Sequence, residues 1–261
     1  MGLISTFNEW HLGDNLVHLN YLVRLSRHYP QLKFEHFLKD KYIEDLAPLI
    51  PQNISLRPIV ESHEGAINCW IGYENYFHKS SLRNDWVQFH LSFFEKLSLE
   101  LNLDNPIKHA DDLLFDMPLL DGDSPLEEEV DFLVVNSTPL SCQSPEFTEF
   151  YFNNLIELLR GRGFRVVATH PTGDGASALE RGFRLHEIAR LAKHCKEGII
   201  GIPNGPMWLT FNVFVNSNLK CRIVWLGPQK LNLGENCLSI ETPAGITGAL
   251  RRLGFLRLAF L

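Results

Sequence analysis

Gly13 and Asp14 stand together between a short apolar run at residues 2–6 and a segment of helical periodicity. A carboxylate at a strand-to-helix turn has two uses. It can cap the helix by accepting a hydrogen bond from a free backbone N–H group. It can also hold an acid at the mouth of a cleft, where it takes a proton from a reacting hydroxyl group. Gly13 suits both uses, because glycine permits a tight turn or the close approach of a ligand. Capping by Asp14 or Asn15 and acid–base chemistry therefore both remain open.

A second turn with chemical potential lies at residues 202–209, with the sequence IPNGPMWL. A strand that ends in such a turn before a helix presents backbone N–H groups and the positive end of the helix dipole, which bind phosphate well. A plain strand-to-helix turn is the alternative, because Asn-Gly pairs are common in turns. Ser137 and Thr138 follow another apolar run and could donate hydroxyl hydrogen bonds to the same ligand.

Apolar runs that alternate with helical segments must position these turns. The expected strands are residues 2–6, 33–38, 54–60, 131–137, 164–169, 198–202 and 221–227. The expected helices are residues 15–29, 42–50, a helix capped by Asn84 or Asp85, and residues 147–159, 185–194 and 205–214. Strands that are apolar throughout favour parallel sheets covered on both faces. We therefore expect an α/β protein of two Rossmann-like domains, residues 1–127 (with a linker at 106–129) and 128–261, which face a central cleft.

Composition excludes several classes of protein. The net charge is −7 and no basic block is present, which disfavours nucleic-acid binding. The five cysteines form no CxxC pair, so neither a disulfide framework nor a structural zinc site is expected, and a cytoplasmic location fits best. No apolar run approaches the roughly 20 residues that span a bilayer. The histidines show no metal-ligand spacing, so no metal site is expected.

Together the two turns resemble those of the ADP-heptose:lipopolysaccharide heptosyltransferases, a GT-B family classed as glycosyltransferase family 9. The first half matches at Gly13-Asp14. The second half matches at Gly201, Asn204, Gly205, Pro206, Met207, Leu209 and Leu226-Gly227-Pro228. The order and spacing of these residues agree with the family over about half of the chain.

The resemblance implies a GT-B glycosyltransferase that moves a sugar from a nucleotide-sugar donor to a saccharide acceptor of the surface-polysaccharide or lipopolysaccharide type. Asp14 would be the general base of an inverting reaction that needs neither a metal nor a cofactor besides the nucleotide sugar. The first half would bind the acceptor, which could be lipid-linked, so peripheral contact with a membrane is compatible. His11 and His18 flank Asp14 and could orient it, so with Gly13 they are the candidate acceptor-side residues. The implied donor-binding residues are Ser137, Thr138, Asn204, Gly205, Pro206, Met207 and Trp208. For His18, an ordinary, partly exposed histidine is the alternative.

Three departures from the family affect the donor site. Pro203 replaces an aspartate, Trp208 replaces a histidine, and residues 137–147 contain no lysine or arginine. A fixed cation would stabilise the negative charge that develops on a departing diphosphate. Trp208 could stack on a base or sugar, or be part of the core. A non-catalytic nucleotide- or sugar-binding protein, or a structural partner in polysaccharide assembly, is therefore the alternative function. The sequence leaves the donor sugar, the acceptor and the oligomeric state open.

Overall fold

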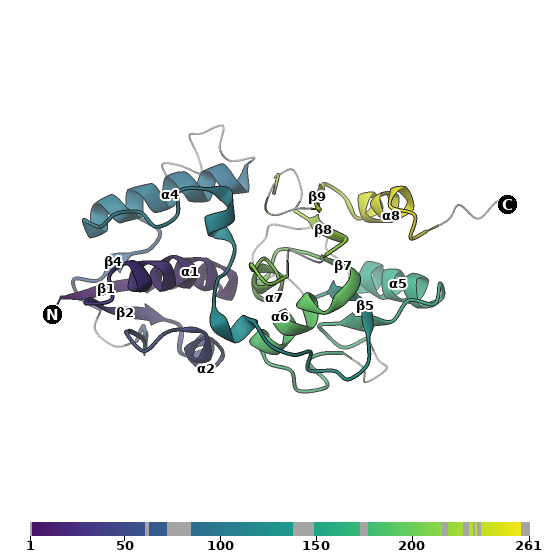
Figure 1. The fold of residues 1–261 in the computed structure, drawn as a ribbon, viewed down its shortest axis with the longest axis horizontal. Coiled ribbons are helices and arrows are strands. Elements are labelled where there is room, and N and C mark those ends of the chain that lie inside the picture. The colour runs from purple at the N-terminus through teal and green to yellow at the C-terminus, as the bar shows by residue number, and fades with distance from the viewer. Residues whose placement is uncertain are drawn as a thin grey trace.

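The computed structural model describes residues 2–60, 63–71, 85–137, 149–172, 177–215, 219–226, 230–231, 233 and 236–256. In this part of the chain, parallel strands form one sheet in the first half and another in the second, with helices around them. Figure 1 shows the first half on the left, in purple and blue, and the second half on the right, in green and yellow. The predicted α/β class with two parallel sheets is confirmed.

The first sheet has the strand order β3-β2-β1-β4, and each of its strand pairs is parallel. Its elements are β1 (Leu3–Asn8), α1 (Leu12–His28), β2 (Lys33–Leu38), η1 (Asp40–Tyr42), α2 (Ile43–Leu46), η2 (Ala47–Leu49), β3 (Ile54–Pro58), β4 (Ile67–Asn68) and α4 (Trp86–Leu101). Helix α4 lies beside α1 (Figure 1), where the rings of Tyr21 and Phe94 stack with centroids 4.8 Å apart.

The second sheet has the order β6-β5-β7-β8-β9 and is also parallel. The linker carries η4 (Ala110–Leu113) and η5 (Pro118–Leu120). The remaining elements are β5 (Val130–Val135), α5 (Glu149–Arg160), β6 (Val166–Ala168), α6 (Leu185–Lys193), β7 (Cys195–Gly201), α7 (Gly205–Leu209), β8 (Cys221–Trp225), β9 (Cys237–Ile240) and α8 (Pro243–Arg252). The boundary between residues 127 and 128 stays a prediction.

Helices α1 and α7 differ from their predicted bounds, and α2 (Ile43–Leu46) covers only part of the predicted helix 42–50, with η1 before it and η2 after it. Helix α1 begins at Leu12 rather than at residue 15, because His11 takes the extended conformation of an N-cap residue, so Gly13 and Asp14 lie in the first helical turn. Helix α7 ends at Leu209 rather than at residue 214. Just beyond this end, the backbone N–H of the linker residue Phe115 donates to the Phe211 carbonyl at 2.8 Å. A longer helix would use that carbonyl for its own hydrogen bonds. Strands β4 and β9 and helix α8 were not predicted.

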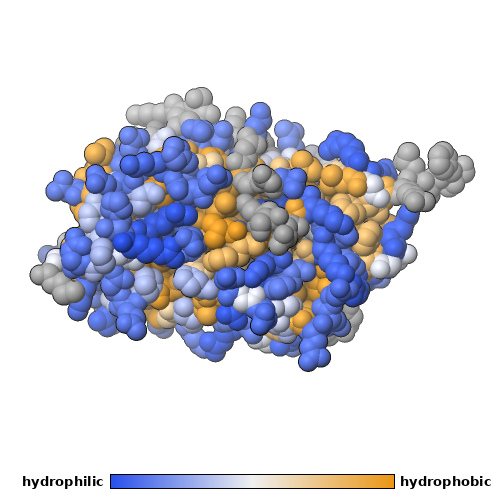
Figure 2. Space-filling view, in the orientation of Figure 1, coloured by the Kyte–Doolittle hydropathy of each residue, from blue (hydrophilic) through white to orange (hydrophobic). Residues whose placement is uncertain are grey.

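A hydrophobic cluster in the described residues spans both halves of the protein. It contains Leu16 and Phe93 from the first half, Phe115 from the linker, and Leu191 and Phe211 from the second half, each at most 1% exposed. A separate cluster fills the space between the second sheet and helices α5 and α8. On the face shown in Figure 2, most of the surface is hydrophilic, and more hydrophobic residues gather toward its middle and the C-terminal half. The halves therefore share a core in addition to the linker.

Among the described residues of the first half, His18, His36 and His90 are buried. Burial lowers the pKa of His36 to about 3 and that of His90 to about 4, and it also holds the pKa of His18 well below the usual value. The alternative that His18 is an ordinary, partly exposed histidine is wrong, because its side chain is fully buried. All three rings are therefore neutral in the folded protein near neutral pH.

Lowering the pH should reduce the free energy of unfolding, because the three buried rings stay neutral in the folded protein but take up protons when it unfolds. Their folded pKa values lie below the unfolded value of 6.5, so the unfolded chain binds protons first as the pH falls. Each such ring should remove up to about 1.4 kcal/mol of stability per pH unit below that value. Urea denaturation of the wild type between about pH 7.5 and 5 should show this decline, and His36→Gln should reduce its slope.

The control is His28→Gln, which replaces an exposed histidine at the end of α1. It should keep the wild-type slope. Equal slopes for the wild type and His36→Gln would contradict the neutral state of the buried ring.

Candidate functional site

Asp14 is the third residue of α1, and its Oδ2 accepts a hydrogen bond from the His11 N–H at 3.1 Å. The carboxylate thus helps to cap the helix, but the N-cap residue is His11 and not Asp14 or Asn15. Burial raises the pKa of the Asp14 carboxyl group, while the His11 N–H and the charges of His11 and Lys39 act in the opposite direction. A carboxylate with a raised pKa is a stronger proton acceptor, as a general base requires.

The first turn of α1 packs directly against the first turn of α7, where the two halves meet in the middle of Figure 1. A methyl group added at Gly13 would lie 2.7 Å from Cδ1 of Trp208 and 3.9 Å from the carbonyl carbon of Asn204. A methyl group added at Gly205 would clash with the Leu12 side chain. Both positions require glycine for close approach. The turn that carries Asp14 and the turn at residues 202–209, which could bind a phosphate, are therefore neighbours.

Trp208 lies in the contact between the halves. It is 7% exposed, and its ring stacks on Trp86 of α4 with centroids 4.5 Å apart and planes 18° apart. The ring also packs against Phe211, with a centroid separation of 5.6 Å. The backbone N–H of Trp86 donates to the Lys230 carbonyl at 3.0 Å, which fixes Trp86 against the second half. Protein side chains thus cover most of the Trp208 ring, which joins the halves, and its predicted role in donor binding stays a prediction.

Polar groups meet at the carboxyl ends of β5, β6 and β7. Asn204 caps α7, because its Oδ1 accepts from the Met207 N–H at 2.9 Å, and its Nδ2 donates to the Ser137 carbonyl at 3.1 Å. The Ser137 Oγ lies 2.8 Å from Nδ1 of His170 and 3.1 Å from Oγ1 of Thr169. The structure thus brings Ser137 and Asn204 together, and His170 lies beside them. Thr138 lies outside the described residues.

The turn at residues 202–209 offers a phosphate fewer backbone N–H donors than its sequence suggests. Pro206 has no N–H group, the Met207 N–H is taken by Asn204, and the Trp208 N–H donates to the Asn204 carbonyl at 3.0 Å. This leaves the amides of Asn204 and Gly205 as the donors that a phosphate could use at this turn. The Met207 side chain is fully buried and belongs to the core.

On the acceptor side, His11 and Gly13 border the Asp14 turn and are partly exposed. His18 does not face it. The His18 ring accepts a hydrogen bond at Nδ1 from Asn8 Nδ2 at 2.7 Å and stacks on Phe93 with centroids 5.6 Å apart. The hydrogen bond to Asn8 links His18 to the turn before α1, because Asn8 Oδ1 accepts from the Trp10 N–H at 2.9 Å.

Two side chains that can carry a positive charge, His170 and Lys39, follow strand ends and were not predicted from the sequence. His170 follows β6, and Lys39 follows β2 and lowers the pKa of Asp14 through its charge. The signal that could have found them is topological, because the carboxyl ends of neighbouring parallel strands meet at one edge of a sheet.

Within the described residues, no three His, Cys, Asp or Glu side chains are placed to hold a metal ion. Among the same residues, no helix is both long and apolar enough to cross a membrane. Cys69, Cys195, Cys221 and Cys237 are free thiols.

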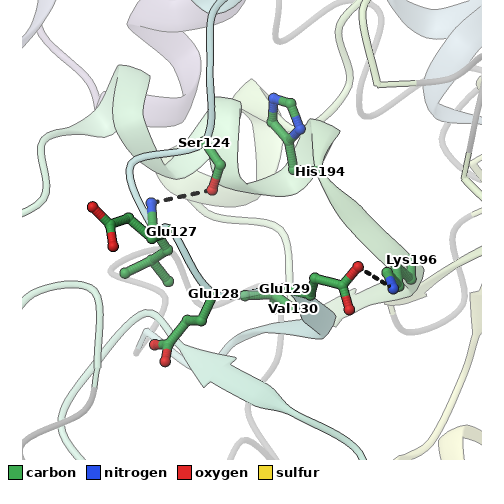
Figure 3. A pocket seen from close by; sticks show the side chains of 8 residues that line it. Ser124, Glu127, Glu128, Glu129, Val130, His194 and Lys196 are labelled. Carbon is green, nitrogen blue, oxygen red and sulfur yellow. Dashed lines mark hydrogen bonds and ion pairs between the residues drawn. The ribbon is translucent and has the colours of Figure 1, made fainter.

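A separate hollow of about 310 Å³ lies where β5 and β7 begin, at the end of the second sheet opposite to Ser137 and Asn204 (Figure 3). Its lining includes Glu128, which pairs with Arg181 at 2.9 Å, and Glu129, which pairs with Lys196 at 2.5 Å. The hydrogen bonds from Lys196 and Arg165 lower the pKa of Glu129 to about 2. These carboxylates are engaged in surface ion pairs, and none of the predicted site residues lines this hollow.

The paired parallel sheets and the apposed turns define a GT-B fold. Its solved relatives include the E. coli heptosyltransferase WaaC with ADP-2-deoxy-2-fluoro heptose (TM-score 0.61, 12% identity, 96% of this chain and 99% of that chain). E. coli ADP-heptose lps heptosyltransferase II is similar as well (TM-score 0.57, 13% identity, 97% and 98%). The iron-containing dodecameric glycosyltransferase TibC from enterotoxigenic E. coli H10407 matches over 91% of this chain and 62% of its own (TM-score 0.52, 17% identity). No protein-family model matches the sequence, and no curated protein matches it.

The contact between the turns can be tested with a single methyl group. Gly13→Ala would press a Cβ atom against the Trp208 ring, which is held on its other side by Trp86. Overpacking of this kind should lower the free energy of unfolding by about 1–3 kcal/mol. Urea denaturation would measure the change.

Gly248→Ala in α8 is the matched control, because a Cβ there would meet no atom within 4 Å. It should stabilise the protein by up to about 1 kcal/mol, the helix-propensity gain of alanine. A Gly13→Ala protein as stable as the Gly248→Ala protein would contradict the close packing.

Proposed function

We propose that the protein is a glycosyltransferase that moves a sugar from a nucleotide-sugar donor to a saccharide acceptor, with Asp14 as the general base. The observation that carries this proposal is the contact between the Asp14 turn of the first half and the turn at Asn204 and Gly205 of the second half. The GT-B fold supports it, because the solved structures that share this fold include glycosyltransferases.

In the proposed reaction, Asp14 takes the proton of an acceptor hydroxyl group while the hydroxyl oxygen attacks the anomeric carbon of the donor sugar. The bond from that carbon to the diphosphate breaks, and the nucleoside diphosphate leaves with the electron pair. Attack from the face opposite the leaving group inverts the configuration. The raised pKa of Asp14 supports this role. We expect no metal ion in the step.

For the donor site, we propose that Ser137, Asn204, Gly205 and His170 surround the diphosphate, with Thr138 extending the set. His170 would supply positive charge, when protonated, in place of the lysine or arginine that residues 137–147 lack. Its ring already contacts the Ser137 hydroxyl group at 2.8 Å. A positive charge near the diphosphate stabilises the negative charge that develops on it as its bond to the anomeric carbon breaks.

The similar structures indicate which classes of donor and acceptor to test first. WaaC has been solved with ADP and with an ADP-sugar analogue, which makes ADP-sugars the first donors to test. We expect the acceptor to be a saccharide of the surface-polysaccharide or lipopolysaccharide type, free or lipid-linked, and the reaction to occur in the cytoplasm. The free thiols of the described cysteines agree with a reducing compartment.

A second candidate is a non-catalytic nucleotide- or sugar-binding protein on the same scaffold. The burial of Trp208 against Trp86 favours it, because this contact packs α7 against α4 beside the Asp14 turn, at the place where substrates would meet. Binding of ADP-sugars without transfer or hydrolysis would support this candidate over the enzyme.

Asp14→Asn should lower the transfer rate by about 100- to 10,000-fold, the usual contribution of a general base. Donor binding measured by calorimetry should stay unchanged. In the wild type, kcat/KM should fall as the pH decreases through the pKa of Asp14, and this acid limb should lie above the ordinary carboxyl value of 3.8.

The control is Asp111→Asn, the same chemical change at an exposed position of the linker. It should leave transfer intact. Equal transfer rates for Asp14→Asn and Asp111→Asn would rule out Asp14 as the base.

His170→Ala should raise the KM for the donor by about tenfold or more, which corresponds to roughly 1.4 kcal/mol for a lost charge-assisted contact. His170→Arg should restore the affinity, because arginine keeps a positive charge at the same strand end. Steady-state kinetics with the donor varied would measure both effects.

His194→Ala is the control, since His194 is exposed and lies where β7 begins, at the other edge of the sheet. A His170→Ala protein with the same donor KM as His194→Ala would remove His170 from the donor site.

A further inference from the structure

Two chains of hydrogen bonds run from the buried interior of the first sheet to the partly buried backbone of the turn that carries Asp14. We propose that His18 and His36 are positioning residues, which fix this turn and thereby the place of the Asp14 carboxylate. This inference rests on the proposed role of Asp14.

The first chain passes through Asn8, at the end of β1. Asn8 Oδ1 accepts from the Trp10 N–H at 2.9 Å, and Asn8 Nδ2 donates to His18 Nδ1 at 2.7 Å. Asn8 and His18 are both fully buried. Since a backbone N–H can only donate, the orientation of the Asn8 amide is determined. The His18 ring therefore locks the side chain that holds the turn at Trp10.

The second chain passes through β2 and α1. Thr6 Oγ1 lies 2.9 Å from His36 Nδ1, and His36 Nε2 lies 3.3 Å from Asn15 Oδ1. Asn15 Nδ2 donates to the His11 carbonyl at 3.0 Å. Because that carbonyl can only accept, the Asn15 amide has one orientation, and His36 Nε2 must be the donor. The hydroxyl group of Thr6 then donates to His36 Nδ1, so the chain has a single direction.

The two chains end on neighbouring residues. One holds the N–H of Trp10 and the other holds the carbonyl of His11, while the His11 N–H donates to Asp14 Oδ2 at 3.1 Å. A shift of this turn moves the hydrogen bond that Asp14 accepts. Both chains require neutral rings whose Nδ1 atoms accept hydrogen bonds. Leucine would fill similar space without continuing either chain.

The test compares His18→Leu and His36→Leu with variants that retain the required polar atom. Asparagine at position 18 places an acceptor near the former Nδ1, and glutamine at position 36 places a donor near the former Nε2. Both leucine variants should accelerate hydrogen exchange at the Trp10 and His11 amides by about tenfold or more relative to the amides of β6 and β8. The His18→Asn and His36→Gln variants should recover part of the protection.

Two further measurements follow the carboxylate itself. In the leucine variants, the NMR-measured pKa of Asp14 should fall toward its ordinary value, because opening the turn reduces the burial that raises it. The kcat of transfer should fall by up to about 100-fold, as expected for a displaced catalytic group, while the donor KM stays within about threefold.

His90→Leu is the matched control. His90 is a third buried histidine in the same half, but its Nδ1 contacts the Trp86 carbonyl at 2.8 Å and not the turn. It should cost stability without changing the exchange of the Trp10 and His11 amides. Wild-type exchange rates and an unchanged Asp14 pKa in both leucine variants would overturn the proposal. If the wild type shows no transfer, the proposed function fails, while exchange and the Asp14 titration still decide the positioning role.

Discussion

The arrangement depends on the close approach of two helix beginnings, one from each half of the chain. Gly13 in α1 and Gly205 in α7 remove the side chains that would hold these turns apart, and Trp208 and Leu12 occupy the space. This contact sets an acid beside a turn with free amides. The parallel topology makes the meeting possible, because both turns follow the carboxyl ends of strands, where the loops of such sheets converge.

The second constraint is that the site-bearing turn is held from the interior of the protein. Helix α1 is buried along most of its length, and its polar residues Asn15 and His18 bond to side chains of the first sheet. Buried polar groups are costly unless paired, so their pairing specifies one geometry. A carboxylate mounted on such a helix has little freedom to move. This rigidity is consistent with a catalytic group and also with a well-formed binding site.

Much of the fold could be predicted from the sequence, because apolar strands and helical periodicity are local signals. The pattern KFEHFL, for example, matches β2 residue for residue. Features set by distant parts of the chain could not be predicted. The end of α7 depends on Phe115 of the linker, and the burial of His18 depends on Asn8 and on the aromatic rings of α4. Asp14 and Asn204 were recognised by their family pattern, whereas His170 comes from another strand end that spacing along the chain does not reveal.

The hydrophobic cluster shared by both halves has a consequence for how such a protein moves. In a two-domain molecule joined only by a tether, a hinge can open at little cost. Here opening would expose Phe115 and Phe211 to water as well as separating Trp86 from Trp208. The two halves should therefore resist wide hinge rotation and lose their structure together on heating, as one cooperative unit.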